Sequence, residues 1–167
     1  SASQDFTWSV WIKTSRTGDI PGTYMDILNK TVPYNPNDGW SLSMCMCPPD
    51  EIRGMLEVYF MDEDRRCRRL YSHGRYNDGQ WHHLAVVRQS DNAYLYVDGV
   101  LDNSLSGIGD FSLSLGNSQG LVIGARPEGL GSNTRCYFVG AMDEVIIANQ
   151  AWTFEQVADY YNAAIGQ

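Results

Sequence analysis

The chain has 167 residues and a net charge of −8, and 43% of its residues are hydrophobic. This length suits one compact domain with a buried core, and the composition excludes a disordered tail and a collagen-like repeat. The acidic balance argues against nucleic acid binding through phosphate neutralisation. Its apolar runs are far shorter than the roughly 18 to 20 residues that cross a bilayer, and the first residues lack a signal-peptide pattern. We therefore expect no nucleic acid partner and no membrane insertion.

Short alternating segments separated by turn residues run along most of the chain. In the first of them Phe6, Trp8, Val10 and Ile12 alternate with mostly polar residues, and Trp11 is the exception. This alternation predicts a half-buried strand. Further strands are expected at residues 24–30, 39–46, 53–61, 67–73, 80–88, 93–97, 121–124 and 136–148. No strand alternates with a long helix, so an antiparallel all-β sandwich is favoured over βαβ units.

One helix is predicted near the C-terminus. Thr153 can cap the free amides of a first turn, and Gln156, three residues on, can complete a capping box. An apolar stripe follows at Val157, Tyr160, Tyr161 and Ala164. We expect this lone amphipathic helix to form a lid across one end of the sandwich.

The chain contains four cysteines, Cys45, Cys47, Cys67 and Cys136. Their spacing differs from that of zinc motifs, and an even count in a β-rich chain indicates two disulfides made in an oxidising compartment. If Cys45 and Cys47 lie on one strand, their Cα atoms are about 6.6 Å apart, a poor geometry for bonding to each other. Each would then bond Cys67 or Cys136, and the pairing stays open. Four reduced, buried thiols are the alternative.

Seven segments in a fixed order carry a resemblance to a known family. They are FTWSVWIK at 6–13, ILNK at 27–30, GWSL at 39–42, DGQWHHLAV at 78–86, LYVDG at 95–99, VIG at 122–124 and FVGAMDEV at 138–145. Together they resemble the LamG-like jelly roll of the concanavalin A-like lectin/glucanase superfamily. The resemblance implies a two-sheet antiparallel jelly-roll sandwich with one short C-terminal helix. It covers residues from about 6 to 161, so 1–167 is expected to be a single domain.

The start of the chain departs from the family pattern, which usually opens with an extra strand before the Phe-Thr segment. Residues 1–5 alone precede that segment here. We therefore expect the domain to be excised from a larger extracellular protein. Its localisation would be secreted or at a cell surface, with other domains of the same parent protein as neighbours.

The family includes glycosidases, but the chain lacks the Glu-x-Asp-x-x-Glu run of laminarinase-type enzymes. Asp143 and Glu144 are adjacent on a predicted strand, so they point to opposite faces and make no catalytic pair. His82 and His83 are expected to be structural. No catalytic residue is predicted, and the expectation is a domain that is not an enzyme.

Calcium is weighed separately, because these folds often hold one between a loop and the last strand. Asp143 matches the recurrent acidic position of the family and is the candidate metal ligand. The alternative is a carboxylate that accepts hydrogen bonds from nearby turn amides. The loop at 126–135 contains one acid, Glu128, which argues against pentraxin-style calcium-bridged ligand binding. Any calcium is therefore expected to be structural.

Candidate ligand-binding residues lie on a long Gly-containing loop and on one strand. Arg126, Asn133 and Arg135 belong to the loop and offer planar hydrogen-bonding groups, although a solvated connector explains them too. Tyr71 and His73 alternate on the strand expected at 67–73, so they would share a face and line a concave surface. A sheet surface without ligand is the alternative for this pair.

An arginine run adds a further hypothesis about the ligand. It comprises Arg65, Arg66, Arg68 and Arg69. Guanidinium groups bind carboxylates and sulfates bidentately, so the run could hold an anionic polysaccharide. The acidic residues at 62–64 immediately before it can instead neutralise it as cross-strand pairs.

The sequence thus predicts a noncatalytic carbohydrate-binding module whose partner is a polysaccharide or glycan. Aromatic stacking and hydrogen bonds from Arg and Asn side chains would hold the sugar. An extracellular adhesion or protein-interaction module is the first alternative. A jelly-roll glycosidase is the second.

Overall fold

A computed structural model describes residues 5–18, 24–31, 39–46, 50–61, 67–108, 120–126 and 136–166. These residues form ten strands and one helix. The strands are β1 (Phe6–Lys13), β2 (Tyr24–Asn29), β3 (Gly39–Cys45), β4 (Leu56–Met61), β5 (Cys67–Tyr71), β6 (Trp81–Gln89), β7 (Asn92–Val97), β8 (Val100–Ser106), β9 (Val122–Ile123) and β10 (Ala141–Ala148), and the helix is α1 (Phe154–Ile165).

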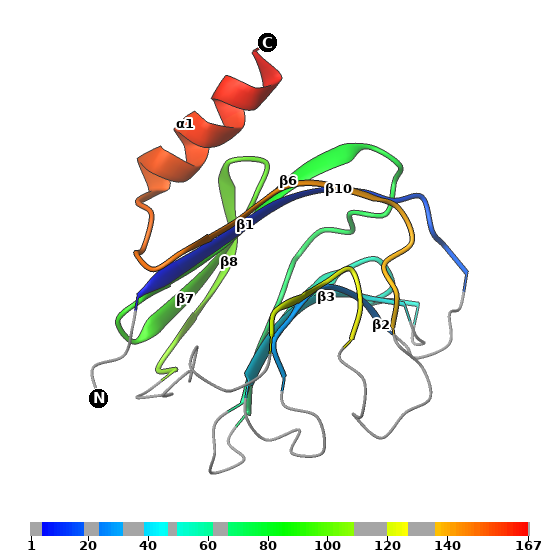
Figure 1. The fold of residues 1–167 in the computed structure, drawn as a ribbon, viewed down its shortest axis with the longest axis horizontal. Coiled ribbons are helices and arrows are strands. Elements are labelled where there is room, and N and C mark those ends of the chain that lie inside the picture. Colours follow the sequence, from blue (N-terminus) through cyan, green and yellow to red (C-terminus); the bar gives the residue numbers. More distant parts are fainter. Residues whose placement is uncertain are drawn as a thin grey trace.

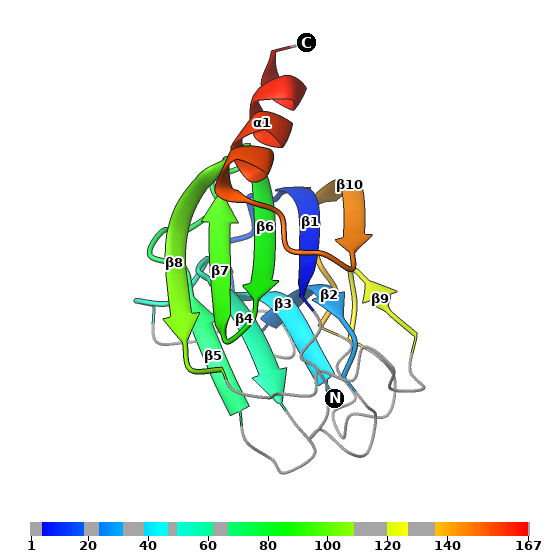
Figure 2. The ribbon, with the colours of Figure 1, turned by 90° about the vertical axis from the view of Figure 1, so that its left-hand side faces the viewer.

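The strands form two stacked antiparallel sheets of five strands each. Sheet A has the order β10-β1-β6-β7-β8, and sheet B has the order β5-β4-β3-β2-β9. Both sheets curve in the same sense, so the outer face of sheet A is convex and that of sheet B is concave (Figure 1). Figure 2 shows the strands of sheet A in their order with α1 above them. The predicted two-sheet antiparallel jelly-roll sandwich is confirmed.

The sequence missed β8, and several predicted strands are longer than the observed ones. β8 reads VLDNSLS, with too little alternation to be recognised. A tight turn places it beside β7, because Asp98 and Gly99 adopt positive φ angles of 51° and 76°. The strand expected at 67–73 ends at Tyr71, and the one expected at 136–148 begins at Ala141.

Aromatic rings join the two sheets in the core. Trp8 of β1 stacks on Trp40 of β3 with ring centroids 3.6 Å apart, and on Phe6 with centroids 4.2 Å apart. Phe60 of β4 lies 5.9 Å from Trp8. All four side chains are almost completely buried. The inward alternation predicted for residues 6–12 therefore supplies the contact between the sheets.

Helix α1 packs against the convex face of sheet A, not across one end of the sandwich as the sequence analysis expected. Val157 is buried against the outward-facing Ala85, Val87 and Tyr96. The predicted capping box is confirmed, since Thr153 accepts a hydrogen bond from the amide of Gln156 and that side chain accepts one from the Thr153 amide.

Trp11 breaks the alternation of β1 because it belongs to this second cluster. Its ring lies 5.7 Å from that of Tyr161 in α1 and 5.3 Å from that of His83. An outward-facing tryptophan is buried here by the helix. Among the described residues, α1 is the one helix, and its twelve residues are too few and too polar to cross a lipid bilayer.

His82 bridges two turns at one end of sheet A. Its Nδ1 lies 2.8 Å from Asp98 in the β7–β8 turn, and its Nε2 lies 3.1 Å from Asp78 in the turn before β6. Carboxylates only accept hydrogen bonds, so both contacts are hydrogen bonds when the ring is protonated to an imidazolium. The hydrogen bond to Asp98, with a smaller contribution from Asp78, outweighs burial and raises the pKa of His82.

Substitution of Val157 tests the docking of the helix. Val157→Ala removes two buried methyl groups, and we expect it to lower the free energy of unfolding by about 2 kcal/mol. Val100→Ala is the matched control, because Val100 is 65% exposed. Urea denaturation followed by circular dichroism measures both variants. Equal effects of the two substitutions would contradict the packing of α1 on sheet A.

A pH series tests the charged state of His82. Because its folded pKa is raised above the ordinary value of 6.5, the imidazolium stabilises the fold fully below that pH. This stability is lost as the pH rises through the folded pKa. We expect the free energy of unfolding to fall between pH 6.5 and the folded pKa, and to fall less steeply in His82→Gln. Identical pH slopes for the two proteins would contradict the bridge.

Candidate functional site

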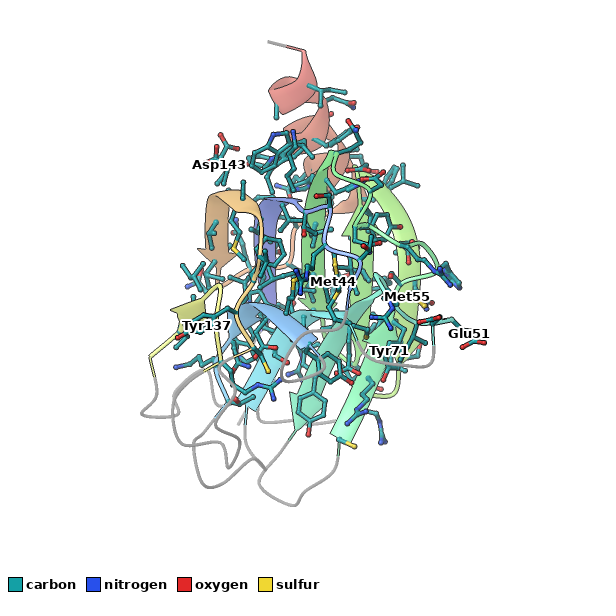
Figure 3. All side chains as sticks on the ribbon, turned by 90° about the vertical axis from the view of Figure 1, so that its right-hand side faces the viewer. Met44, Glu51, Met55, Tyr71, Tyr137 and Asp143 are labelled. Carbon is teal, nitrogen blue, oxygen red and sulfur yellow. The ribbon has the colours of Figure 1, made fainter. Side chains whose placement is uncertain are left out.

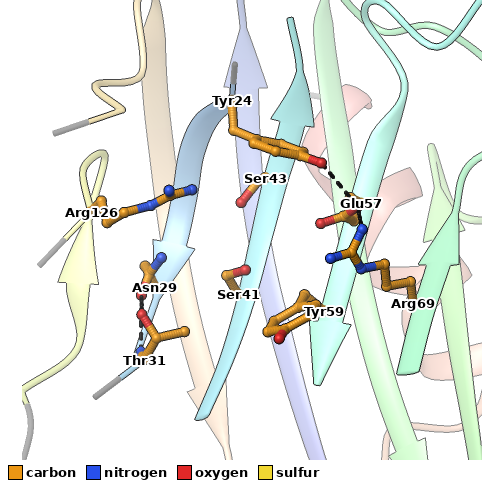
Figure 4. A pocket seen from close by; sticks show the side chains of 9 residues that line it. All are labelled: Tyr24, Asn29, Thr31, Ser41, Ser43, Glu57, Tyr59, Arg69 and Arg126. Carbon is orange, nitrogen blue, oxygen red and sulfur yellow. Dashed lines mark hydrogen bonds and ion pairs between the residues drawn. The ribbon is translucent and has the colours of Figure 1, made fainter. Parts of the chain in front are cut away.

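The concave outer face of sheet B is polar. Along its strands the residues that point away from the core include Ser41 and Ser43 of β3 and Glu57 and Tyr59 of β4. They border a hollow of about 220 Å³. Its lining consists of Tyr24, Asn29, Thr31, Ser41, Ser43, Glu57, Tyr59, Arg69 and Arg126 (Figure 4).

A buried carboxylate organises one half of this hollow. Asp26 of β2 is 0% exposed and accepts four hydrogen bonds. Arg126 donates two of them, through Nε at 2.9 Å and Nη2 at 3.2 Å, and Ser43 and Asn29 donate the others at 2.8 Å. Asn29 Oδ1 in turn accepts hydrogen bonds from the amide and hydroxyl of Thr31. Arg126, Ser43 and Asn29 are thereby held in single orientations.

A second carboxylate organises the other half. Glu57 lies 3.8 Å from the guanidinium of Arg69 on β5, and the Tyr24 hydroxyl donates to it across 3.4 Å. Tyr71 pairs with Glu57 across the β4–β5 ladder and belongs to the same group, because burial and then its interaction with Glu57 raise the pKa of the Tyr71 hydroxyl. The Arg69 guanidinium also lies over the ring of Tyr59, 5.3 Å from its centroid. Arg69 and Arg126 thus reach into the hollow from opposite edges (Figure 4).

The electrostatics of the site keep both arginines charged and the tyrosines neutral. Burial lowers the pKa of Arg126, but its hydrogen bonds to Asp26 outweigh that effect and raise the pKa overall. The hydrogen bond with Tyr71, aided by the charge of Glu57, raises the pKa of Arg69. Burial, and then the charge of Glu57, raise the pKa of Tyr24. At neutral pH the hollow therefore presents hydroxyl groups and paired guanidinium groups.

Of the predicted loop residues, Arg126 lies in this hollow and holds Asp26. Asn133 and Arg135 lie outside the described residues. Tyr71 adjoins the hollow through Glu57 and Arg69, so its predicted place on the concave face agrees with the structure. Its role in ligand binding stays a prediction.

The expectation that His73 shares a face with Tyr71 is wrong. Strand β5 ends at Tyr71, so alternation does not extend to His73. Its amide donates to the Asp102 carboxylate of β8 across 2.8 Å, and its Nδ1 lies 2.7 Å from the Asp102 carbonyl oxygen. The side chain is therefore directed to sheet A, away from the hollow.

Asp143, the candidate calcium ligand, is exposed on β10, and its Oδ1 accepts a hydrogen bond from the Glu144 amide across 2.8 Å. Within the described ranges, no group of three or more His, Cys, Asp or Glu side chains is placed to hold a metal ion. Calcium binding through Asp143 stays a prediction.

The predicted disulfides are not seen among the described cysteines. Cys45 and Cys136 are buried, Cys67 is exposed, and none of the three is joined to another. Cys47 lies outside the described residues. Of the arginine run, Arg65 and Arg66 also lie outside them, while Arg68 and Arg69 are described and exposed.

Sequence reasoning missed most of the residues that line the hollow. A signal was present, because polar or hydroxyl-bearing residues alternate with apolar ones along residues 41–44 and 57–60. This pattern identifies a solvated sheet face. What it cannot show is that the solvated faces of β2 to β5 lie side by side, since strand order depends on the fold.

The chain belongs to the concanavalin A-like lectin/glucanase superfamily, whose laminin G-type family profile matches residues 1–158. Among curated proteins, the human adhesion G-protein coupled receptor D1 is 34% identical over 118 residues. That match covers 69% of this chain and 12% of the receptor.

Solved structures share the fold at low sequence identity. The binding domain of Paraclostridial Mosquitocidal Protein 1 has a TM-score of 0.72 and 19% identity, with 96% of this chain and 37% of that chain covered. The receptor-binding domain of botulinum neurotoxin D has a TM-score of 0.70 and 17% identity, with 99% of this chain and 38% of that chain covered. A proposed carbohydrate-binding protein from Bacteroides ovatus has a TM-score of 0.68 and 18% identity, with 95% of this chain and 41% of that chain covered. This chain thus spans less than half of each of these proteins.

Substitution of Asp26 tests the organisation of the hollow. Asp26→Asn leaves the guanidinium of Arg126 without its carboxylate, and we expect the free energy of unfolding to fall by about 3 kcal/mol. Asp159→Asn, which makes the same change on the exposed face of α1, should alter it by less than about 0.5 kcal/mol. Chemical denaturation of both variants provides the measurement. A fall of under 1 kcal/mol in Asp26→Asn would show that Asp26 does not organise the site, since the loss of even two neutral hydrogen bonds costs about that much.

Proposed function

We propose that this domain is a noncatalytic carbohydrate-binding module that holds a neutral glycan in the hollow on the concave face of sheet B. The observation that carries the proposal is the composition of the lining, with five hydroxyl-bearing residues, one amide and two guanidinium groups around a preformed hollow. Sugar hydroxyls pair with such groups, and aromatic rings pack against the apolar faces of sugar rings. Tyr24 and Tyr59 supply both a ring and a hydroxyl.

The balance of charges favours a neutral ligand over an anionic polysaccharide. Each guanidinium in the hollow already faces a carboxylate, since Arg126 pairs with Asp26 and Arg69 lies beside Glu57. A sulfate or uronate would have to compete with these internal partners. A neutral sugar can instead add hydrogen bonds without breaking the pairs.

The same pairing argues against glycoside hydrolysis in this hollow. A catalytic carboxylate needs a free oxygen for a proton or for the sugar, whereas four hydrogen bonds occupy the Asp26 carboxylate. Glu57 alone cannot supply both the acid and the base. The structural neighbours support this proposal, since they include two toxin binding domains and a proposed carbohydrate-binding protein.

An extracellular location and neighbouring domains belong to the same proposal. The likeness to an adhesion receptor, of which this chain spans 12%, supports both. A structural calcium and a disulfide through Cys47 remain predictions from the sequence.

A glycan array tests the proposed function. The folded domain is applied to neutral, acidic and sulfated glycans, once with calcium and once with a chelator, and we expect neutral glycans to bind in both conditions. Tyr59→Ala should weaken binding about fivefold to tenfold, because a ring that packs against sugar contributes roughly 1 kcal/mol. Tyr137→Ala is the matched control, since Tyr137 is 54% exposed and lies outside the hollow (Figure 3).

Three outcomes would contradict the proposal in different ways. Absence of glycan binding by a folded sample would favour a protein-interaction module. Binding that Tyr59→Ala leaves unchanged would place the glycan site elsewhere on the domain. Binding restricted to sulfated glycans would revive the arginine run as the ligand site.

A further inference from the structure

A second hollow lies on the opposite side of the sandwich, between sheet A and the C-terminal end of α1. Its volume is about 330 Å³. Its lining consists of Trp11, Trp81, Asp143, Glu144, Ala164 and Ile165. Asp143 projects from β10 at the level of α1 (Figure 3). None of these residues belongs to the proposed glycan site.

Negative charge gathers at this hollow. Asp143 accepts a hydrogen bond from the Glu144 amide, and Glu144 accepts one from the Tyr160 hydroxyl. Within the described part of the chain, neither carboxylate forms an ion pair. The last turn of α1 carries no basic residue, so the partial negative charge of its terminal carbonyl groups is not offset there. Lys13, the basic residue on the neighbouring strand β1, lines a different hollow.

The remaining walls are apolar and aromatic. Trp81 is 42% exposed and presents an accessible indole ring, and Ile165 is 57% exposed. Trp11 is only 8% exposed, and its indole nitrogen has no hydrogen-bond partner among the described residues. This nitrogen is itself inaccessible, so Trp11 contributes ring surface, not a donor, to the wall of the hollow. The walls therefore offer apolar surface beside the two carboxylates.

The position of Glu144 is set by an unfavourable backbone conformation. Ser9 pairs with Ile146 and Trp11 with Asp143, so two residues of β10 oppose Val10 in a β-bulge. Glu144 in this bulge has a φ of 48°, a left-handed conformation that is rare for a residue with a side chain. Burial and the Glu144 carboxylate raise the pKa of Tyr160 to about 12, so its hydroxyl keeps the proton that it donates. The bulge and this hydrogen bond orient the carboxylate.

We propose that this hollow binds an alkylammonium group, a cation carried on an apolar stem. The two carboxylates and the end of α1 attract the charge, and the Trp81 ring can add a cation–π contact. Ala164 and Ile165 suit the apolar stem. A hard metal ion would instead need several more oxygen ligands than the two carboxylates here. The group can come from a lysine side chain of a protein partner or from a free amine.

Titration with hexylammonium chloride tests this site. The indole N–H signals of Trp81 and Trp11 are followed by two-dimensional NMR, and we expect both to shift saturably. Hexanoate, with the same stem and the opposite charge, should shift neither. Asp143→Asn and Trp81→Ala should each weaken binding about fivefold, as expected for the loss of roughly 1 kcal/mol. Asp159→Asn removes one negative charge from the same helix outside the hollow, and it should leave the affinity unchanged.

A second titration with N-acetyl-lysine amide distinguishes the two sources of the ammonium group. Tighter binding of the lysine derivative supports a protein partner, and tighter binding of hexylammonium supports a free amine. Failure of both compounds to saturate would overturn the proposal. The same shifts produced by calcium chloride would also overturn it, because they would assign the carboxylates to a metal ion. The glycan array is independent of these results, since the two hollows share no residue.

Discussion

The stacking of Trp8 on Trp40 is the contact on which the architecture depends. One ring belongs to β1, an interior strand of sheet A, and the other to β3, the central strand of sheet B, with 3.6 Å between their centroids. Large planar side chains bury much apolar surface and set the spacing of the layers. Once this pair is in place, alternation along each strand decides which side chains face the core and which face outward. The two outer faces then differ because their outward residues differ.

The outer faces of the two sheets differ in polarity and in exposure to solvent. The outward residues of sheet A include Trp11, Ala85 and Val87, so this face is apolar and α1 covers it. The outward residues of sheet B carry hydroxyl groups and charges, so this face stays open as the polar hollow. Helix and hollow are therefore consequences of the same two-residue periodicity. They provide the domain with one face for internal packing and one that stays open, where the glycan site is proposed.

Charged side chains line both proposed sites, but in the part of the chain that the structure describes they are paired in one and unpaired in the other. In the concave hollow each carboxylate is paired with an arginine, and the pairs orient polar groups without leaving net charge. Beside α1 the carboxylates of Asp143 and Glu144 have no such cation among the residues that the structure describes. The first arrangement suits a neutral ligand that forms hydrogen bonds, and the second suits a cation. Two sites of opposite electrostatic character can thus coexist on a domain with an overall charge of −8.

The sequence by itself determined the all-β sandwich, most of its strands and the capped helix, because these depend on local periodicity and on hydrogen bonds between near neighbours. It also identified Arg126 and Tyr71, which lie at the concave face. The tertiary structure decided the rest. It paired Asp26 with Arg126, 100 residues further along the chain, turned His73 toward Asp102, and placed α1 on the convex face. These contacts join segments far apart in the chain, and strand order and curvature bring them together. No local pattern encodes that arrangement.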